Sequence, residues 1–430
     1  MPISDKKIRF KRLFDLLSNR RFLWIIILVA IAVRLLYALV FLGIDFPYID
    51  TINTDSYYYH KMGIIIASSP QDYLSALHPP LYPLLLSLLF RLAGDGYIQM
   101  VCTHILLDIS ALLLVWGLLR RLQNSASASS GALIYALYPE FIFMSGHMIS
   151  EALYIPLLTL SLYLLVRLQE KGELRIAVFA GLALALSALT RANIAAFPLF
   201  LLPWALIALK VKRNLKKRFY SWLIISACFI ALLVPWTVRN YFVFHSFVPI
   251  STSGAEALYG GNHPGANGGF EIKYNEISYL LENPRMEIEN QHRNLDLALN
   301  WISEHPSEFF SLIPLKLYRF FTFESVVAQK ENYWLYFWVG AFTYLPLSAL
   351  AVLGLFFSFK NWRRYLLFYL LVIYYVITTM VFFGDLRLRT PLIPIYIILG
   401  CLAVSKLLRW QTEDKEIWEG QRAVIQTRTN

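Results

Sequence analysis

Charged residues are scarce in this chain. Only 16% of its 430 residues are Asp, Glu, Lys or Arg, whereas a soluble domain usually contains about 25%. Hydrophobic residues make up 57%, and the mean hydropathy is +0.52. This composition excludes a disordered chain, a collagen-like chain and a coiled coil. The apolar residues gather in runs of about 18 or more, the length that a helix needs to cross roughly 30 Å of hydrocarbon. The sequence therefore predicts an all-α polytopic membrane protein.

Cysteine is also rare. The three cysteines all lie in apolar runs, at Cys102, Cys228 and Cys401. The polar segments therefore have no cysteine pair for a disulfide framework, and no Cys-x-x-Cys metal spacing occurs. His60, His147 and His263 are not spaced as metal ligands either. We expect no metal site and no required cofactor, and the sequence alone leaves dependence on a divalent metal open.

The apolar runs predict about ten transmembrane helices, with both ends of the chain on one side of the membrane. They fall near residues 22–43, 96–119, 131–147, 151–168, 176–190, 193–209, 219–243, 334–358, 365–383 and 391–408. The first run is too long for the core of a signal peptide and no small-residue cleavage site follows it, so we expect it to remain as a span. A shorter run over about 80–93 has a proline-rich start and is expected to form an interfacial helix in the first outer loop.

The Lys and Arg residues set the predicted orientation. Most of them lie in the two tails and in alternate short connections, which the positive-inside rule places in the cytoplasm. These short juxtamembrane clusters lack a surface of stacking aromatics, so the net charge of +11 does not indicate a nucleic-acid partner. The expected location is the cytoplasmic (inner) membrane, with the active site facing the periplasm or the cell exterior; an archaeal membrane is the alternative.

This topology divides the chain into five parts. They are a cytoplasmic basic tail at 1–21, an N-terminal transmembrane catalytic module at 22–243 that includes a first outer loop at 44–79, a second outer loop at 244–333, C-terminal transmembrane helices at 334–408, and a cytoplasmic tail at 409–430. The second outer loop is expected to be partly helical. Its helix runs from Glu287 to Glu304, with Leu295, Leu299 and Ile302 on one face.

Ionisable residues near the outer ends of the spans are the candidates for chemistry, because a charge at membrane depth is costly unless it is paired or faces water. They are the carboxylates Asp50, Asp55, Glu140 and Glu151 and the arginines Arg191, Arg239, Arg387 and Arg389. A guanidinium group suits phosphate oxygens, and a nearby carboxylate could take the proton of an attacking hydroxyl. Carboxylates beside arginines at one membrane face thus suggest group transfer from a phosphorylated lipid.

Several short motifs, taken in order, carry a family resemblance. They are Asp55-Ser56-Tyr57-Tyr58, His78-Pro79-Pro80-Leu81-Tyr82-Pro83, Ser150-Glu151-Ala152-Leu153-Tyr154, Leu189-Thr190-Arg191, Pro235-Trp236-Thr237-Val238-Arg239-Asn240 and Arg387-Leu388-Arg389-Thr390-Pro391-Leu392. Over residues 22–408 the chain resembles the C-type membrane glycosyltransferases that use polyprenyl-phosphate sugars, a superfamily that includes the protein O-mannosyltransferases and the lipid A aminoarabinose transferase. The chain lacks the adjacent Asp-Glu pair of the eukaryotic protein O-mannosyltransferases. It also has Leu77-His78 where the aminoarabinose transferases carry Glu-Lys, so it is assigned to neither subgroup.

The resemblance implies an inverting transferase that moves a hexosyl or pentosyl group from a polyprenyl-phosphate donor to an envelope lipid, glycan or protein acceptor. The lipid tail of the donor would lie along the spans, in the bilayer. The resemblance also implies a catalytic carboxylate in the first outer loop, for which Asp55 is the best match and Asp50 the reserve. Glu151 is expected to orient the acceptor or to hold Arg191 or Lys61. The donor phosphate is expected to meet Arg239, Arg387, Arg389, Arg191, His78 and Lys61.

Each candidate residue could instead have a purely structural role. Asp55 could cap the helix that follows it, Glu151 could stabilise the start of a span, and the arginines could reach from span ends to the interface. Arg34, inside the first span, is open to pairing with Asp108 or to contact with substrate. A flippase or transporter of lipid-linked sugars is the alternative function, and a non-catalytic scaffold is a third. Transporters usually carry charges at the bilayer midplane, whereas here the charges gather at one face, which favours the transferase.

Overall fold

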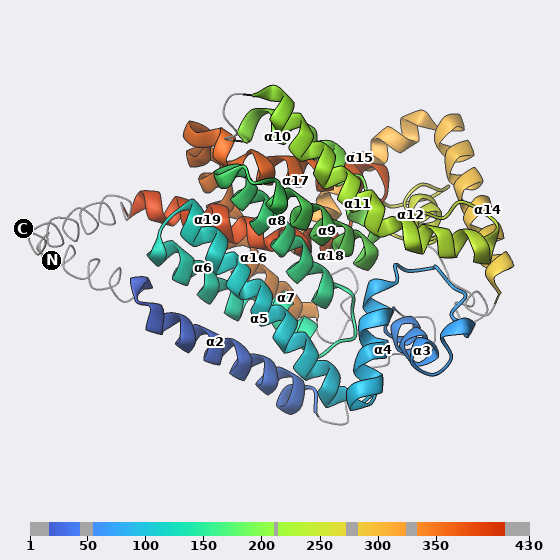
Figure 1. Ribbon diagram of the computed structural model, residues 1–430, viewed down its shortest axis with the longest axis horizontal. Helices are drawn as coiled ribbons and strands as arrows, with labels where there is room; N and C mark the ends of the chain where they lie inside the picture. The colour runs from blue at the N-terminus through green and yellow to red at the C-terminus, as the bar shows by residue number, and fades with distance from the viewer. Residues whose placement is uncertain (1–16, 44–54, 210–213, 272–282, 324–332, 409–430) are drawn as a thin grey trace, which may run out of the picture.

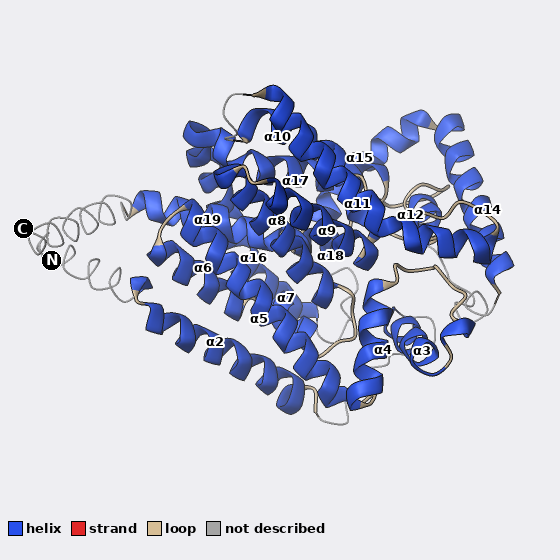
Figure 2. Cartoon of the chain, viewed as in Figure 1, coloured by secondary structure: helices blue, strands red, loops and turns tan. Residues whose placement is uncertain are grey.

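All regular structure in the described chain is helical (Figures 1 and 2). The computed structural model describes residues 17–43, 55–209, 214–271, 283–323 and 333–408. Its helices are α2 (Arg20–Leu35), α3 (Asp55–Ser68), α4 (Leu81–Ala93), α5 (Tyr97–Leu122), α6 (Ser125–Leu137), α7 (Pro139–Ser145), α8 (Glu151–Lys171), α9 (Leu174–Thr190), α10 (Phe197–Ala208), α11 (Leu215–Phe244), α12 (Ser253–Gly260), α14 (Pro284–Glu304), α15 (Pro306–Phe321), α16 (Tyr333–Ser358), α17 (Trp362–Val381), α18 (Leu386–Arg389) and α19 (Ile393–Leu407). The predicted class, an all-α polytopic membrane protein, is confirmed.

The number of spans differs from the prediction. Six stretches of the described residues are long and apolar enough to cross a membrane: Arg21–Phe41, Tyr97–Leu122, Glu151–Lys171, Leu215–Phe244, Phe337–Val381 and Leu386–Leu407. The fifth of them, 45 residues long, contains most of α16 and all of α17, whereas α9 and α10 have only 17 and 12 residues. The predicted run 131–147 is divided between α6 and α7, because Tyr138 before Pro139 takes an extended conformation. A count of ten spans is therefore not confirmed.

The basic connections of the chain meet at one end of the helix bundle. Arg364 donates to the carbonyl of Arg121 at 2.5 Å, Arg121 pairs with Glu170 at 2.7 Å, and Gln169 donates to the carbonyl of Arg363 at 3.2 Å. At this end α2 begins and α19 ends (Figure 1). The opposite end carries α3, α4, α12 and α14, so the bundle has one basic end and one end built from the two predicted outer loops (Figure 1).

Small residues let the helices approach closely. A Cβ on Gly181 of α9 would lie 2.4 Å from the carbonyl oxygen of Ile225 in α11, and one on Gly354 of α16 would lie 1.8 Å from that of Leu399 in α19. Close backbone packing of this kind replaces the hydrophobic effect as the attraction between helices in lipid. These contacts hold α11 against α9, and α16 against α19.

A buried ion pair joins the first span to α5. Arg34 is fully buried, and its Nε lies 2.6 Å from Asp108 Oδ2, while its Nη1 donates to the carbonyl of Ala136 at 2.8 Å. Of the two roles left open for Arg34, the structure shows pairing with Asp108. The side chain therefore ties α2 to α5 and α6.

The described residues 245–271 and 283–323, which include α12, α14 and α15, form what we call the outer segment. The predicted helix within it is α14, which ends at Glu304, two residues before Pro306. The side of α14 that carries Leu295 and Leu299 is not the buried one, because these residues are 37% and 51% exposed, whereas Ile288 and Trp301 are buried. The interfacial helix predicted over 80–93 is present as α4.

Candidate functional site

Helix ends and one loop bring charged side chains to a single place. Asp55 and Glu151 are the first residues of α3 and α8, where the helix dipole favours a carboxylate. Arg191 directly follows α9, and Arg387 lies in the one-turn helix α18. His78 lies in the loop that precedes α4. We call these five residues the ion cluster.

Glu151 is the centre of the ion cluster. Its Oε1 lies 2.7 Å from Nη1 of Arg191 and 2.9 Å from both Nε and Nη2 of Arg387. Nη2 of Arg387 also lies 3.2 Å from Oδ2 of Asp55. One guanidinium group therefore bridges carboxylates from α3 and α8.

The two carboxylates differ in access to solvent. The side chain of Glu151 is 1% exposed, whereas those of Asp55 and Arg387 are 39% and 47% exposed. An incoming ligand can therefore reach Asp55 and Arg387 from solvent. Glu151 contacts both arginines from the buried side of the cluster.

His78 completes the cluster on the Asp55 side. Its Nε2 lies 3.5 Å from Oδ1 of Asp55, and its ring packs edge-on against Tyr58. Burial lowers the pKa of His78 more than the neighbouring Asp55 carboxylate raises it, and the charges of Arg191 and Arg387 lower it further. The imidazole is thus neutral at pH 7 and can donate one hydrogen bond toward the carboxylate.

Asp55 is ionised at neutral pH. Burial by itself raises the pKa of this carboxyl group, but the charge of the adjacent Arg387 guanidinium brings the pKa below its usual value. A carboxylate in this state accepts hydrogen bonds and is a weak base as long as Arg387 stays beside it.

Arg389, which was expected at the donor phosphate, is engaged elsewhere. It is 1% exposed, donates to the carbonyl of Thr322 at 2.5 Å and lies 3.4 Å from Glu140. Thr390 donates to the same carboxylate at 2.8 Å. Arg389 therefore fastens α18 to α7 and to the end of α15.

Arg239 also holds protein groups. Its guanidinium lies 4.9 Å and 4.6 Å from the ring centroids of Tyr73 and Trp236, and it donates to the carbonyls of Tyr73 and Ser75. Arg239 thus supports the loop that leads to His78 and is not brought into the ion cluster. Lys61 lies over the ring of Tyr57, 6.0 Å from its centroid. Asp50 lies outside the described residues.

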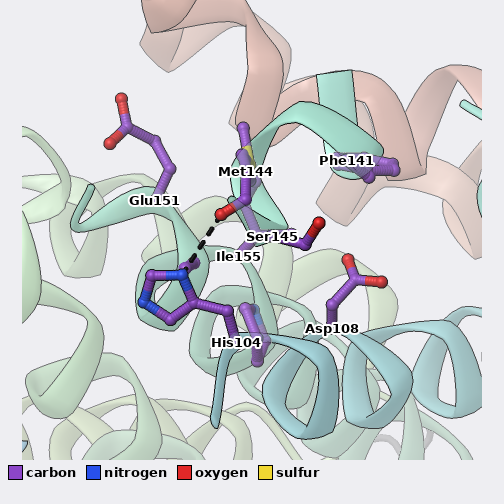
Figure 3. Close-up of a pocket in the computed structure, with 9 residues that line it drawn as sticks. His104, Asp108, Phe141, Met144, Ser145, Glu151 and Ile155 are labelled. Carbon is purple, nitrogen blue, oxygen red and sulfur yellow. Dashed lines mark hydrogen bonds between the residues drawn. The ribbon is translucent and has the colours of Figure 1, made fainter. Parts of the chain in front are cut away.

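A small pocket lies beside Glu151, between α5, α7 and α8 (Figure 3). It is lined by His104, Asp108, Phe141, Met144, Ser145, Glu151, Ala152, Ile155 and Pro156. His104 Nδ1 lies 3.2 Å from the carbonyl of Met144, and its Nε2 lies 2.9 Å from the hydroxyl of Tyr82. Because a carbonyl only accepts, Nδ1 carries the proton, and in the neutral ring Nε2 accepts from Tyr82. Sequence reasoning missed His104, although its position one helical turn before Asp108 was a signal for a shared polar face.

The residues described here offer few ligands for a metal. No group of three or more His, Cys, Asp or Glu side chains in the described ranges is placed to hold an ion. In the ion cluster itself, the two carboxylates already face two guanidinium groups.

Comparison with known proteins identifies the fold. Residues 77–238 match the sequence family described as dolichyl-phosphate-mannose-protein mannosyltransferase. The structure is similar to that of the oligosaccharyltransferase of Archaeoglobus fulgidus, solved with a tethered acceptor peptide that contains the NVT sequon. The TM-score is 0.56 and the identity 13%, over 91% of this chain and 50% of that one. The chain has a C-type membrane glycosyltransferase fold. The resemblance predicted from the motifs is confirmed.

A second archaeal structure, the oligosaccharyltransferase AglB in complex with an inhibitory peptide and a dolichol-phosphate, gives a TM-score of 0.55 and 14% identity, over 93% of this chain and 52% of that one. The chain thus spans about half the length of the solved structures that share its C-type fold. A comparison with curated protein sequences finds no match. The family match includes His78, Glu151 and Arg191, while Asp55 and Arg387 lie outside it.

Proposed function

We propose that the chain is a glycosyltransferase that moves a monosaccharide, with inversion, from a polyprenyl-phosphate donor to a hydroxyl group of an envelope lipid, glycan or protein. The observation that carries the proposal is the guanidinium of Arg387, which is held between two carboxylates and is half exposed. A fixed and accessible guanidinium suits phosphate oxygens. The family match over residues 77–238 and the dolichol-phosphate in the AglB structure support a lipid-linked donor.

The proposed reaction uses Asp55 as the base for the acceptor hydroxyl and Arg387 as a ligand of the donor phosphate. The acceptor oxygen attacks C1, the bond between C1 and the phosphate oxygen breaks, and the hydroxyl proton passes to Asp55. The negative charge that develops on the lipid phosphate is stabilised by Arg387 and Arg191. When the phosphate takes Arg387, the charge that lowers the pKa of Asp55 is shared with the phosphate, and Asp55 becomes a stronger base.

We propose a smaller set of ligands for the donor phosphate than the sequence suggested. We retain Arg387, Arg191 and His78, which belong to the ion cluster, and assign Arg239 and Arg389 to holding the loops around it. Lys61 as a phosphate ligand and Asp50 as a reserve base stay predictions.

The positions of these residues also bear on two further expectations, namely the division of the chain into parts and the side of the membrane on which the site lies. Glu151 holds Arg191 and Arg387, which favours the cation-holding role expected for it. The site then draws on the C-terminal helices as well as on the 22–243 module. We place it on the periplasmic or outer side of the inner membrane, because it lies away from the basic connections.

A substitution of Asp55 tests the proposal. Asp55→Asn keeps the shape of the side chain and removes the base, so we expect it to abolish transfer and to leave donor binding largely intact. Asp95→Asn is the matched control, because Asp95 precedes α5 near the same end of the bundle and is 60% exposed. The variants are expressed in cells that lack the gene, and envelope glycans and glycolipids are analysed by mass spectrometry. Binding of a labelled polyprenyl-phosphate sugar is measured on the purified proteins.

The same experiment separates the alternatives. Wild type and Asp95→Asn should restore the missing sugar, and full restoration by Asp55→Asn would refute its role. In proteoliposomes, product formation without an ion gradient supports transfer. Movement of the lipid-linked sugar across the bilayer without product would instead support a flippase. The gathering of charges at one end of the bundle argues against that outcome.

A further inference from the structure

Two buried charged side chains connect the outer segment to the chain around the ion cluster. They are Glu287 of α14, which is 2% exposed, and Lys316 of α15, which is fully buried. Neither forms an ion pair within the described part of the chain, and both have neutral hydrogen-bond partners. A buried charge without an opposite charge costs free energy, and an apolar side chain of similar size is often as stable or more so. The presence of Glu287 and Lys316 at buried sites would be explained if their hydrogen bonds hold other parts of the chain in place.

Glu287 holds the loop that carries His78. Its Oε1 accepts the N–H of Ala76 at 2.9 Å and the hydroxyl of Thr252 at 2.7 Å. The N–H of Thr252 donates to the carbonyl of Ala76 at 2.9 Å, so three hydrogen bonds close a ring. Ala76 lies two residues before His78, and the ring therefore fixes the direction from which His78 approaches Asp55.

Lys316 holds the turn that leads to Arg387. Its Nζ donates to Asn262 Oδ1 at 2.7 Å and to the carbonyls of Met380 and Val381 at 3.3 Å and 3.4 Å. Asn262 also donates to the carbonyl of Val381, at 3.0 Å. These carbonyls are at the end of α17, where the helix dipole favours a cation. Arg387 follows Val381 by six residues.

Glycines let the backbones meet at the same turn. The N–H of Gly384 donates to the carbonyl of Gly268 at 2.8 Å. A Cβ on Gly384 would lie 1.9 Å from the carbonyl oxygen of Lys316, and one on Gly261 would lie 2.0 Å from that of Phe382. The outer segment is thus in direct backbone contact with the turn before α18.

We propose that the outer segment acts as a clamp on the ion cluster, with Glu287 and Lys316 as positioning residues. One arm of the clamp fixes the His78 loop and the other fixes the turn before α18. Together they set the separation between the Asp55 carboxylate and the Arg387 guanidinium. The activity part of this inference rests on the proposed glycosyl transfer, whereas the structural part does not.

The activity test compares substitutions on α14 and α15. In Glu287→Ala the ring of hydrogen bonds is lost, and because a displacement of about 1 Å can lower a rate about 100-fold, we expect kcat to fall by about 10- to 100-fold with the KM for the donor nearly unchanged. Glu287→Gln keeps an oxygen acceptor and should stay close to wild type. The matched control is Glu289→Ala, because Glu289 lies on the same helix and forms an exposed pair with Arg285. Lys316→Met, which keeps the length and removes the donors, should lower kcat in the same way.

A second measurement tests the clamp without any assay of glycosyl transfer. A double-mutant cycle of Asp55→Asn and Arg387→Gln measures the coupling of this pair in thermal unfolding of the full chain. We expect coupling in the wild-type background and its loss in the Glu287→Ala and Lys316→Met backgrounds. If Glu287→Ala does not fold, Lys316→Met carries both measurements.

The outcomes separate the two proposals. A wild-type chain that transfers no sugar but shows clamp-dependent coupling refutes the proposed function and supports the clamp. Wild-type kcat together with unchanged coupling in either background overturns the clamp, whatever the reaction is.

Discussion

Neutralising Glu151 tests whether the buried carboxylate holds the two arginines together. Glu151→Gln keeps the shape of the side chain and one oxygen acceptor, and it removes the charge that faces Arg191 and Arg387 at 2.7 Å and 2.9 Å. Two guanidinium groups would then face each other, and Asp55, on the exposed side, would be the carboxylate left in an ion pair with Arg387. We expect the folded state to lose stability and Arg387 to lose its fixed position.

The magnitude follows from burial. Removing one partner of a fully buried ion pair costs about 3–5 kcal/mol. Glu151 is 1% exposed, but Arg387 is 47% exposed and partly screened by solvent, so we expect about 3 kcal/mol. The entropy of unfolding of globular chains, about 2.1 cal/mol/K per residue, converts this to a fall in Tm of roughly 3 °C.

The assay is thermal unfolding of the purified variants in one detergent. Glu173→Gln is the control, because Glu173 forms an exposed pair with Arg175 at 2.6 Å and its loss should leave Tm unchanged. The double variant Glu151→Gln with Arg191→Gln removes a charge of each sign and should be more stable than Glu151→Gln alone. An unchanged Tm in Glu151→Gln, or a double variant less stable than the single one, would refute the reasoning.

Three further predictions concern the scaffold of the site. Burial raises the pKa of Glu287 from 4.5 to about 6, so the folded state binds a proton more readily than the unfolded state. As the pH falls from 7 to below 4.5, the free energy of unfolding of the wild type should therefore rise by about 2 kcal/mol relative to that of Glu287→Gln. Plots of Tm against pH for the two proteins should converge or cross. Arg34→Gln leaves Asp108 without its cation in a span and should cost about 3 kcal/mol, and added Asp108→Asn should recover part of the lost Tm. Gly384→Ala places a Cβ 1.9 Å from a backbone oxygen and should lower both Tm and transfer, whereas Gly254→Ala, which meets nothing within 4 Å, should change neither.

The sequence was sufficient to predict that the residues of the ion cluster lie together at one end of the helix bundle. Hydrophobic runs fix where the chain crosses, and the polarity of the connections fixes which ends lie together. For this reason Asp55 and Arg387, more than 300 residues apart, could be expected to meet, and they lie 3.2 Å apart. The membrane restricts the possible arrangements far more than water does.

The rotation of short elements could not be predicted. Arg387 and Arg389 are two residues apart in α18, so their side chains point about 200° apart around the helix axis. One faces Glu151 and the other faces Glu140. Asp385 fixes this rotation by accepting the N–H of Arg387 at 2.7 Å, a contact that no periodicity indicates.

Burial in the outer segment could not be predicted for a related reason. The prolines at 284 and 306 define α14, but which of its faces is covered depends on where α12 and the His78 loop lie. Glu287 therefore faces inward while Leu299 is exposed. His104 was overlooked because it lies in a mostly apolar run. Its hydrogen-bond partners, Tyr82 and Met144, are distant from it in the sequence, so no local pattern indicates them.

The order of the cluster along the polypeptide has a consequence for biosynthesis. A ribosome that has inserted the first 380 residues has supplied both acids and Arg191, but the guanidinium that joins Asp55 to Glu151 has not yet been made. Until α18 follows, the nascent protein holds an incomplete pocket beside membrane lipids that carry phosphate. The proposed transfer can therefore begin only after α18 has been made and has packed beside α3 and α8.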